Sequence, residues 1–278
     1  MAKLYIVPTP IGNLDDITLR AVNVLREVDF ILAEDTRTTS FLLKHLGIEQ
    51  KLRSHHKFNE HATVEMVAGA IAAGRNAALV SDAGTPAISD PGEDLVRLCG
   101  QQDITVQAIP GCCAAVCALA VSGLPTGRFC FEGFLSANKK ERRTRLEELS
   151  HEERTMVFHE APHKLRPTLA DMLEVLGDRP VALCRELTKL HEEIWKTTLG
   201  EAQTHYAEND PRGEYVLVMA GAPAAEAEEE LTLEQAAQRA LELTRNGYAA
   251  SAAAKAAAQG TPYSKSEVYK QLLALQAD

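Results

Sequence analysis

The sequence SDAGTPAISDPG at residues 81–92 decides the fold, because it has the pattern of a connection between a buried strand and a helix. The apolar run just before it, at residues 76–80, suits a buried strand. At its end, Asp90 and Pro91 precede Glu93 in the order of a capped helix start. Asp90 is expected to accept from the first backbone N–H groups, and Glu93 completes a capping box. Strand, tight turn and helix in this order predict an α/β sheet.

The turn also predicts a ligand site of a particular charge. In an open α/β sheet, ligands bind at the carboxyl edge of the strands, where this turn lies. Asp82 occupies a position at which a phosphate would be repelled. The turn therefore suits a ribose hydroxyl, an ammonium or a sulfonium better than a pyrophosphate. The alternative interpretation is a well-capped connection that binds no ligand.

Strands and helices alternate along the first part of the chain. Strands are expected at 4–7, 29–33, 52–55, 76–80 and 104–109, with helices at 13–28, 38–46, 60–73, 90–99 and after 113. This alternation predicts a parallel, doubly wound sheet. The sequence SGLPTG at residues 122–127 breaks the pattern, so we expect the first α/β domain to occupy residues 1–122.

A second α/β domain is expected at residues 123–222, followed by a small helical domain. Its strands are expected at 128–134, 154–158, 180–186, 193–199 and 214–220, and its helices at 138–149, 162–176 and 200–207. The acidic sequence APAAEAEEE at residues 222–230 reads as a linker. Residues 231–278 then predict a helix-turn-helix-like appendage, in which Ser264 and Glu267 form a capping box.

Composition limits the possible functions. The 278 residues include 45% hydrophobic residues, enough for two ordinary domain cores, and no apolar run approaches the ~20 residues of a membrane helix. The six cysteines form no CxxC pair, and neither they nor the histidines have metal-ligand spacing. With a first strand that begins at once and no signal-peptide pattern, we expect a reduced, cytoplasmic protein with no membrane partner and no metal.

The charge of the chain argues against a DNA-binding protein. The net charge of −10 counts against generic nucleic-acid binding, and the segment from residue 223 onward carries five basic and eight acidic residues. The sequence KKERRTR at residues 139–145 is the densest basic segment and is a candidate RNA-contacting helix. A solvated surface helix is the competing interpretation.

Five further motifs accompany residues 81–92. They are PTPIGNL at 8–14, AEDTR at 33–37, PGCCAA at 110–115, FEGF at 131–134 and RELTK at 185–189. Together they resemble the bacterial ribosomal RNA small subunit methyltransferase I family, a branch of the tetrapyrrole-methylase-like enzymes. The resemblance covers essentially the whole chain, with a cysteine at position 112 where proline is more usual. It implies two doubly wound α/β domains with the cofactor cleft between them, plus a small C-terminal helical domain.

The resemblance implies an activity and a set of binding residues. The activity is S-adenosylmethionine-dependent 2′-O-methylation of a cytidine ribose in the decoding region of 16S ribosomal RNA in the small subunit, by a homodimer. The residues that match the family's cofactor motifs are Pro10, Ile11, Gly12, Asp82, Thr85, Cys113, Ala114, Glu160 and Leu187.

A ribose hydroxyl is a poor nucleophile, so a base or a charge-stabilising group is expected beside it. The candidates at strand ends are Glu34, Asp35, Arg37, Glu186 and Lys189. We favour Glu34 as the base and Arg37 as the group that positions RNA, because both lie in one turn. The competing hypothesis is that positioning alone suffices and that Glu34 only orders its loop.

Two other functions remain compatible with the sequence. One is methylation of a tetrapyrrole, against which the basic segment and the C-terminal helices count. The other is a non-catalytic RNA-binding module, which predicts no affinity for S-adenosylmethionine. Nucleotide hydrolysis, hydride transfer and triad hydrolysis lack their motifs, because the chain has no Walker-A loop, Rossmann fingerprint or GxSxG elbow.

Overall fold

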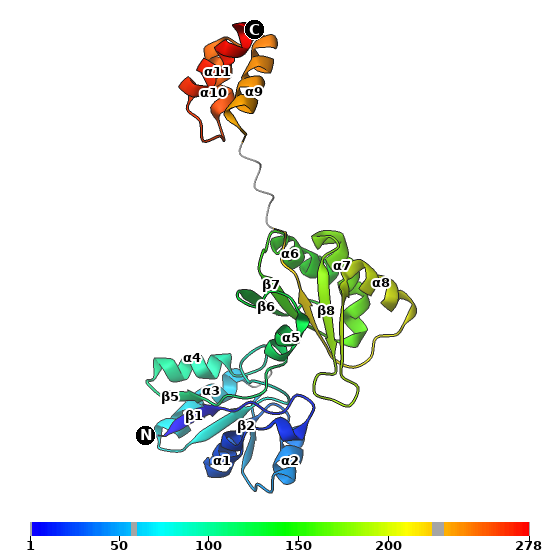
Figure 1. Ribbon diagram of the computed structural model, residues 1–278. Coiled ribbons are helices and arrows are strands. Elements are labelled where there is room, and N and C mark those ends of the chain that lie inside the picture. Colours follow the sequence, from blue (N-terminus) through cyan, green and yellow to red (C-terminus); the bar gives the residue numbers. More distant parts are fainter. Residues whose placement is uncertain (1, 57–59, 224–230, 278) are drawn as a thin grey trace. The chain divides into compact units, whose positions relative to one another are not determined.

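The computed structural model describes residues 2–56, 60–223 and 231–277 (Figure 1). The chain forms two compact units, Met1–Ala222 and Pro223–Asp278. The first unit holds two five-stranded sheets, and the second holds three helices. The α/β class with an added helical part is therefore confirmed.

The first sheet is parallel and has helices on both faces. Its strands are β1 (Lys3–Ile6), β2 (Phe30–Ala33), β3 (Leu52–Ser54), β4 (Ala77–Val80) and β5 (Thr105–Ala108), in the order β3-β2-β4-β1-β5. Its helices are η1 (Leu14–Asp16), α1 (Leu19–Glu27), α2 (Thr36–His45), α3 (Glu60–Ala72) and α4 (Glu93–Gln101). Side chains alternate along β2, so that Phe30 packs with α3 and α4 while Ile31 packs with α1 and α2. This is the predicted doubly wound arrangement.

The second sheet is mixed. Its strands are β6 (Phe129–Phe134), β7 (Thr155–Glu160), β8 (Pro180–Arg185), β9 (Glu193–Thr198) and β10 (Tyr215–Met219), in the order β6-β7-β10-β8-β9. β6 and β7 are parallel, whereas β10 is antiparallel to both of its neighbours and β9 is antiparallel to β8. Strands β6, β7 and β8 therefore run in one direction, and their carboxyl ends share an edge with the beginning of β10.

Both faces of the second sheet are covered by helices. Leucines of α6 (Lys139–Glu148), α7 (Pro162–Leu176) and α8 (Leu199–Glu208) pack on one face. On the other face, Ala115, Ala118 and Leu119 of α5 (Ala114–Ser122) pack against strand residues such as Val157 and Val216. Helix α5 thus precedes residue 123 in sequence but packs with the second sheet. The division into 1–122 and 123–222 stays a prediction.

The start of α4 differs from the sequence prediction. The helix begins at Glu93, and its N-cap is Gly92, whose φ of 128° lies in the region that favours glycine. A Cβ at this position would collide with the Leu79 side chain. The predicted cap by Asp90 is therefore wrong, because the backbone turns into the helix two residues later. As a result, the Asp90 carboxyl is available for another role.

The basic segment on α6 is largely paired within the protein. Arg142 is buried and forms a 2.6 Å ion pair with Asp171. Arg143 pairs with carboxylates of α7, and Arg145 pairs with one carboxylate of β6 and one of α6 itself. Lys139 and Lys140 are exposed. As an RNA contact, this candidate segment is therefore wrong for Arg142, whose guanidinium is in the interior.

The helical unit has a core of small side chains. Its helices are α9 (Leu233–Arg245), α10 (Ala250–Ala258) and α11 (Lys265–Ala277). The buried residues that form this core cluster are Ala236, Ala240, Ala253, Ala254, Ala257, Val268 and Leu272. The predicted capping box is confirmed, since the Ser264 and Glu267 side chains each accept the other's backbone N–H. Of the helices in the described ranges, none is both long and apolar enough to cross a membrane.

Candidate functional site

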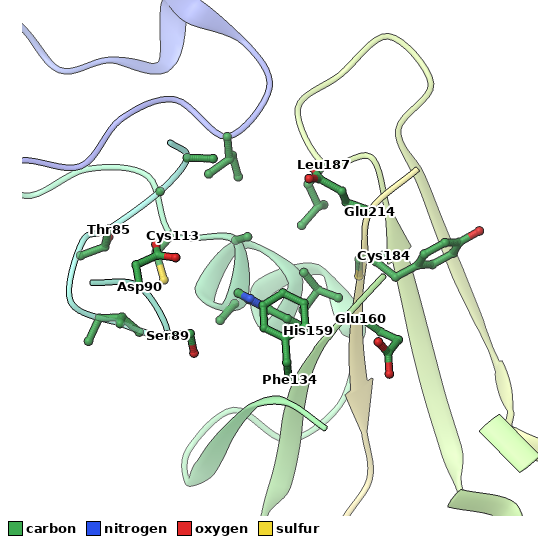
Figure 2. A pocket seen from close by; sticks show the side chains of 18 of the residues that line it. Thr85, Ser89, Asp90, Cys113, Phe134, His159, Glu160, Cys184, Leu187 and Glu214 are labelled. Carbon is green, nitrogen blue, oxygen red and sulfur yellow. The ribbon is translucent and has the colours of Figure 1, made fainter. Parts of the chain in front are cut away.

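A cavity of about 490 Å³ lies where the ends of the two sheets face each other within the first unit (Figure 2). One wall comes from the loops that follow β1, β2, β4 and β5, at the carboxyl edge of the parallel sheet. The other wall comes from the ends of β6, β7 and β8 and the start of β10. Parallel strand directions explain why residues far apart in sequence converge here.

Most of the predicted site residues line this cavity. They are Ile11, Glu34, Asp82, Thr85, Cys113, Ala114, Glu160 and Leu187. The other three lie elsewhere. Pro10 lines a smaller cavity of about 80 Å³, together with Phe41. Gly12 packs against residues 187–189, and the Arg37 side chain is 90% exposed and pairs with Asp35 at 2.6 Å.

Glu34 and Asp82 fasten two strand ends to each other. The Asp82 carboxylate accepts the backbone N–H of Asp35 at 3.0 Å, and the Glu34 carboxylate accepts the backbone N–H of Asp82. Burial, and then the negative charge of Asp82, raise the pKa of Glu34. Both carboxylates therefore hold the loop geometry in addition to facing the cavity.

The other first-sheet loops are fastened through threonines. Thr9 and Gly84 exchange two backbone hydrogen bonds, of 2.9 and 3.0 Å. The Thr85 hydroxyl donates to the carbonyl of Cys112 at 2.9 Å. The loops after β1, β4 and β5 thus form one connected wall. The Thr85 hydroxyl donates its proton within this wall and can only accept a hydrogen bond from a ligand.

Asp90 lies on the same wall and has a different environment. Burial, and then repulsion by Glu34, raise the pKa of Asp90 to about 6, although a hydrogen bond from Ser81 opposes the shift. Three carboxyl groups, from the loops after β2 and β4, therefore face one side of the cavity. A cation is the natural ligand for such a wall.

The opposite wall is aromatic because of a bulge in β6. The strand's register against β7 shifts between Phe131 and Gly133, so one residue is inserted. In a regular strand, Phe131 and Phe134 would point to opposite faces; with the bulge, both contact the His159 ring, at centroid distances of 5.2 and 5.3 Å. Phe134 remains 55% exposed at the cavity.

His159 lines the second-sheet wall beside Phe134. Burial lowers the pKa of its imidazole, while Glu214 acts in the opposite direction. Within the described part of the chain, its buried Nε2 has no hydrogen-bond partner. Figure 2 shows His159 on the second-sheet side of the cavity, with Asp90 and Ser89 across from it. A polar ring flanked by two phenyl rings suits a planar ligand that can stack and hydrogen-bond.

Glu160 follows His159 and is held in a buried network. Its carboxylate accepts the Thr168 hydroxyl at 2.6 Å and the Ala161 N–H at 2.9 Å, and it pairs with Lys164 at 3.0 Å. Because the residue is 2% exposed, its oxygens are occupied by the protein. The network fixes the junction of β7 and α7 at the cavity wall.

Lys189 closes the cavity beside Leu187. Its ammonium pairs with Glu186 at 2.9 Å and with Glu214 at 2.8 Å. Burial lowers the pKa of Lys189, but the hydrogen bonds that its ammonium donates to Glu214 and Glu186 outweigh this effect and leave the pKa raised. The positive charge is thus balanced within the second-sheet wall.

Backbone strain is concentrated in the loops on the two walls. In the described ranges, five residues other than glycine have positive φ, and four of them are Ala87, Ser89, Glu186 and Thr188. Ala87 and Ser89 belong to the loop after β4, and the other two flank Leu187. Such conformations persist where packing holds them, and they are common at functional sites.

Sequence reasoning missed several residues of this cavity. The sequence pattern predicts Asp90 as a helix cap and does not distinguish Phe134 or His159 as site residues. The sequence does hold a signal for Phe134 and His159, because both lie at the ends of predicted strands. The bulge that turns Phe131 and Phe134 to the same face is not visible in the sequence. No group of three or more metal-ligating side chains is found among the described residues.

Comparisons with known proteins place this geometry in a family. Residues 3–203 match the family model of the Tetrapyrrole (Corrin/Porphyrin) Methylases. A solved structure of the methyltransferase CobJ aligns with a TM-score of 0.59 at 19% identity, covering 81% of this chain and 97% of that one. Uroporphyrin-III-C-methyltransferase from Thermus thermophilus aligns with a TM-score of 0.56 at 20% identity, covering 78% and 94%. These two likenesses concern the fold.

Sequence relatives are more similar. The Ribosomal RNA small subunit methyltransferase I of a Synechocystis species is 46% identical and covers 100% of both chains. The protein of the same name from Escherichia coli O157:H7 is 50% identical over 81% of this chain and 79% of its own. Because the agreement spans both walls of the cavity, this chain belongs to the ribosomal RNA small subunit methyltransferase I family, within the Tetrapyrrole (Corrin/Porphyrin) Methylases.

Proposed function

We propose that this chain methylates the 2′-hydroxyl of a cytidine in the decoding region of 16S ribosomal RNA, with S-adenosylmethionine as the methyl donor. The observation that carries the proposal is the full-length 46% identity to a relative named for small-subunit ribosomal RNA methylation. The cavity supports it through its two chemically distinct walls, one of carboxylates and one of aromatic rings.

The lining residues fit the proposed donor. Asp82 and Glu34 provide negative charge for an ammonium and a sulfonium, and Ile11 and Leu187 provide apolar surface for an adenine ring. The volume of about 490 Å³ lies within the range of roughly 300–1,000 Å³ typical of small-molecule sites. Small residues at Gly84 and Ala114 let a ligand approach the backbone.

The protein's task is mainly one of positioning. S-adenosylmethionine supplies, when bound, a methyl group on an already activated sulfonium. Loops fastened by Asp82, Glu34 and Thr85 keep the wall in one geometry, and orientation of this kind can contribute roughly 7–11 kcal/mol. Phe134 and His159 offer the acceptor nucleobase a stacking surface, as aromatic side chains do for single-stranded RNA.

The proposed site residues have distinct roles toward the two substrates. We propose that Ile11, Asp82, Thr85, Cys113, Ala114 and Leu187 hold the donor, with Pro10 and Gly12 shaping the first loop and Glu160 fixing the cavity wall where β7 meets α7. Glu34 stays a candidate base. Arg37 lies outside the cavity, and its exposed guanidinium suits an RNA phosphate near the entrance.

The proposed partners are the small ribosomal subunit and a second copy of this chain, in the cytoplasm. A methyl acceptor within assembled RNA must reach the cavity, and Phe134 is exposed at the cavity. A tetrapyrrole would instead need a pocket for a whole macrocycle. The experiment below separates the two acceptors.

The test uses tritiated S-adenosylmethionine and small subunits from a strain that lacks the enzyme. We expect tritium in 16S ribosomal RNA, on one cytidine, in a dinucleotide that resists alkaline hydrolysis because its 2′-oxygen is blocked. Subunits from the strain that has the enzyme are the control and should take up no label. Label on a nucleobase, or none in RNA, would contradict the proposal.

A further inference from the structure

The carboxyl groups of Asp82, Glu34 and Asp90 face the cavity from the loops of the first sheet, and the first two also hold the backbone of these loops in place. Asp82 accepts the backbone N–H of Asp35, and Glu34 accepts the backbone N–H of Asp82. Both are thereby fixed to the main chain at a strand end. Asp90 is different, since it does not cap α4 and the group that lowers its pKa is a side chain, Ser81, whose hydroxyl also donates to the carbonyls of Ala83 and Gly84.

The position of Asp90 is imposed by its loop. Ala87 and Ser89, just before it, have φ of 64° and 63°, and Gly92, just after it, has φ of 128°. The loop also approaches the second sheet closely, because a Cβ at Gly133 would lie 2.9 Å from the Ser89 hydroxyl. This construction keeps an otherwise costly half-buried carboxyl directed at the cavity.

We propose that Asp90 is the catalytic base that takes the proton from the acceptor hydroxyl, an inference that rests on the proposed function. The hydroxyl O–H bond breaks and its proton moves to an Asp90 carboxylate oxygen. The hydroxyl oxygen keeps the electron pair and forms the new bond to the methyl carbon. The electron pair of the broken carbon–sulfur bond stays on the donor's sulfur, which becomes neutral.

The electrostatic environment supports this role. A base works best when its pKa is near the operating pH, and burial together with Glu34 and Asp82 raises the pKa of Asp90 to about 6. At pH 7.5 the carboxyl is ionised yet more basic than an ordinary aspartate. The charged or titratable groups across the cavity are His159, Glu160, Lys189, Glu214, Tyr215 and Cys184. Lys189 is neutralised by Glu186 and Glu214, so it does not cancel the shift.

The decisive experiment compares Asp90→Asn with Glu34→Gln. Single-turnover methylation of small subunits is measured from pH 5 to 9 with donor and subunits saturating, and donor affinity is measured by calorimetry. For Asp90→Asn we expect a rate lower by about 10²- to 10⁴-fold and loss of the acidic limb of the pH profile, with donor affinity within threefold of wild type. Glu34→Gln should retain the acidic limb. Asp90→Glu, which returns a carboxyl, should recover part of the rate.

A second readout does not depend on catalysis. A carboxyl whose pKa is raised by folding favours the native state below its unfolded pKa, and that contribution is lost as pH rises through the folded value. Replacing Asp90 by Asn should therefore increase the free energy of unfolding at pH 7.5 more than at pH 4.5. The same comparison for the exposed Asp15→Asn should show no such difference.

The outcomes separate the two proposals. A rate for Asp90→Asn within threefold of wild type, or a loss fully explained by weaker donor binding, would overturn the role of Asp90. If wild-type protein labels no RNA, the proposed function fails. The pH dependence of the free energy of unfolding then still reports whether folding raises the pKa of the Asp90 carboxyl.

Discussion

The Asp82 carboxylate contributes both a negative charge and a hydrogen bond to the backbone, and substitutions can separate the two contributions. Its charge faces the cavity, and its Oδ1 accepts the Asp35 N–H at 3.0 Å. Asp82→Asn keeps an acceptor and loses the charge, so donor affinity should fall by about 10- to 150-fold, equivalent to roughly 1.5–3 kcal/mol, with stability nearly unchanged. Asp82→Ala should show the same loss of affinity and, in addition, a free energy of unfolding lower by about 1 kcal/mol.

Calorimetry with S-adenosylmethionine and denaturant titration measure the two effects. Thr9→Val serves as a control for loop anchoring, because it removes the hydrogen bond to the Ser81 carbonyl without changing charge. Donor affinity of Asp82→Asn equal to wild type would mean that the carboxylate does not contact the donor.

The sequence predicted Asp82 and missed Asp90 for a physical reason. Asp82 directly follows a buried strand, so its place at the sheet edge follows from local pattern. Asp90 stands in an Asp-Pro-Gly run that is also typical of helix caps. In the structure Gly92, with φ of 128° and no room for a Cβ beside Leu79, takes the N-cap position, so the helix begins at Glu93 and Asp90 does not cap it.

The bulge in β6 is the local feature on which the aromatic wall depends. Gly133 has φ of 63°, and the space of a Cβ is taken by the Ser89 hydroxyl at 2.9 Å. Gly133→Ala should lower the free energy of unfolding by about 1–3 kcal/mol through backbone strain. Gly127→Ala is the matched control, since nothing lies within 4 Å of its Cβ position and its φ is not positive.

Denaturant unfolding of both variants measures this difference. A regular strand without the bulge would place Phe134 on the other face of the sheet. We therefore expect Gly133→Ala to weaken subunit binding as well as stability. Equal stability of the two variants would contradict the steric argument.

Helix α6 shows how a charge pattern can mislead. Arg142 is 4% exposed, and its guanidinium binds Asp171 as well as the carbonyls of Ser136 and Ala137. Arg142→Ala leaves a buried carboxylate unpaired, so the free energy of unfolding should fall by about 3–5 kcal/mol. Lys140→Ala, on the exposed side of the same helix, should change it by less than about 0.5 kcal/mol. Chemical denaturation compares the two, and similar values would refute the buried pair.

Most of the helices and strands could be predicted from the sequence, but the pairing of strands and of charged side chains far apart in the chain could not. Apolar runs and capping residues located the strands of both sheets, because these signals are local. The antiparallel insertion of β10 between β7 and β8 joins segments more than 25 residues apart and leaves no local trace. The partners of Arg142 and Arg143 lie 28 to 31 residues away, so their pairing was equally hidden.

The cavity and the basic residues of the C-terminal helices lie in different compact units. Every residue that lines the 490 Å³ cavity belongs to Met1–Ala222. In the helical unit, the stretch 231–277 contains five basic and three acidic residues, and all five basic side chains are exposed. The four glutamates at positions 226 and 228–230 give the whole segment its negative balance. The folded helices themselves are thus mildly positive, which suits an RNA surface.

Ending the chain at Ala222 should therefore separate donor binding from RNA recognition. We expect S-adenosylmethionine affinity within about twofold of the full chain, because the cavity is complete, and a higher KM for small subunits. The matched full-length variant replaces Arg239, Arg245, Lys255, Lys265 and Lys270 by glutamine. If these side chains contact phosphates, the salt dependence of subunit binding should flatten by up to about 3.5 units, at roughly 0.7 per contact on single-stranded RNA. A shortened chain with an unchanged KM, or a glutamine variant with an unchanged salt slope, would show that the helical unit takes no part in recognition.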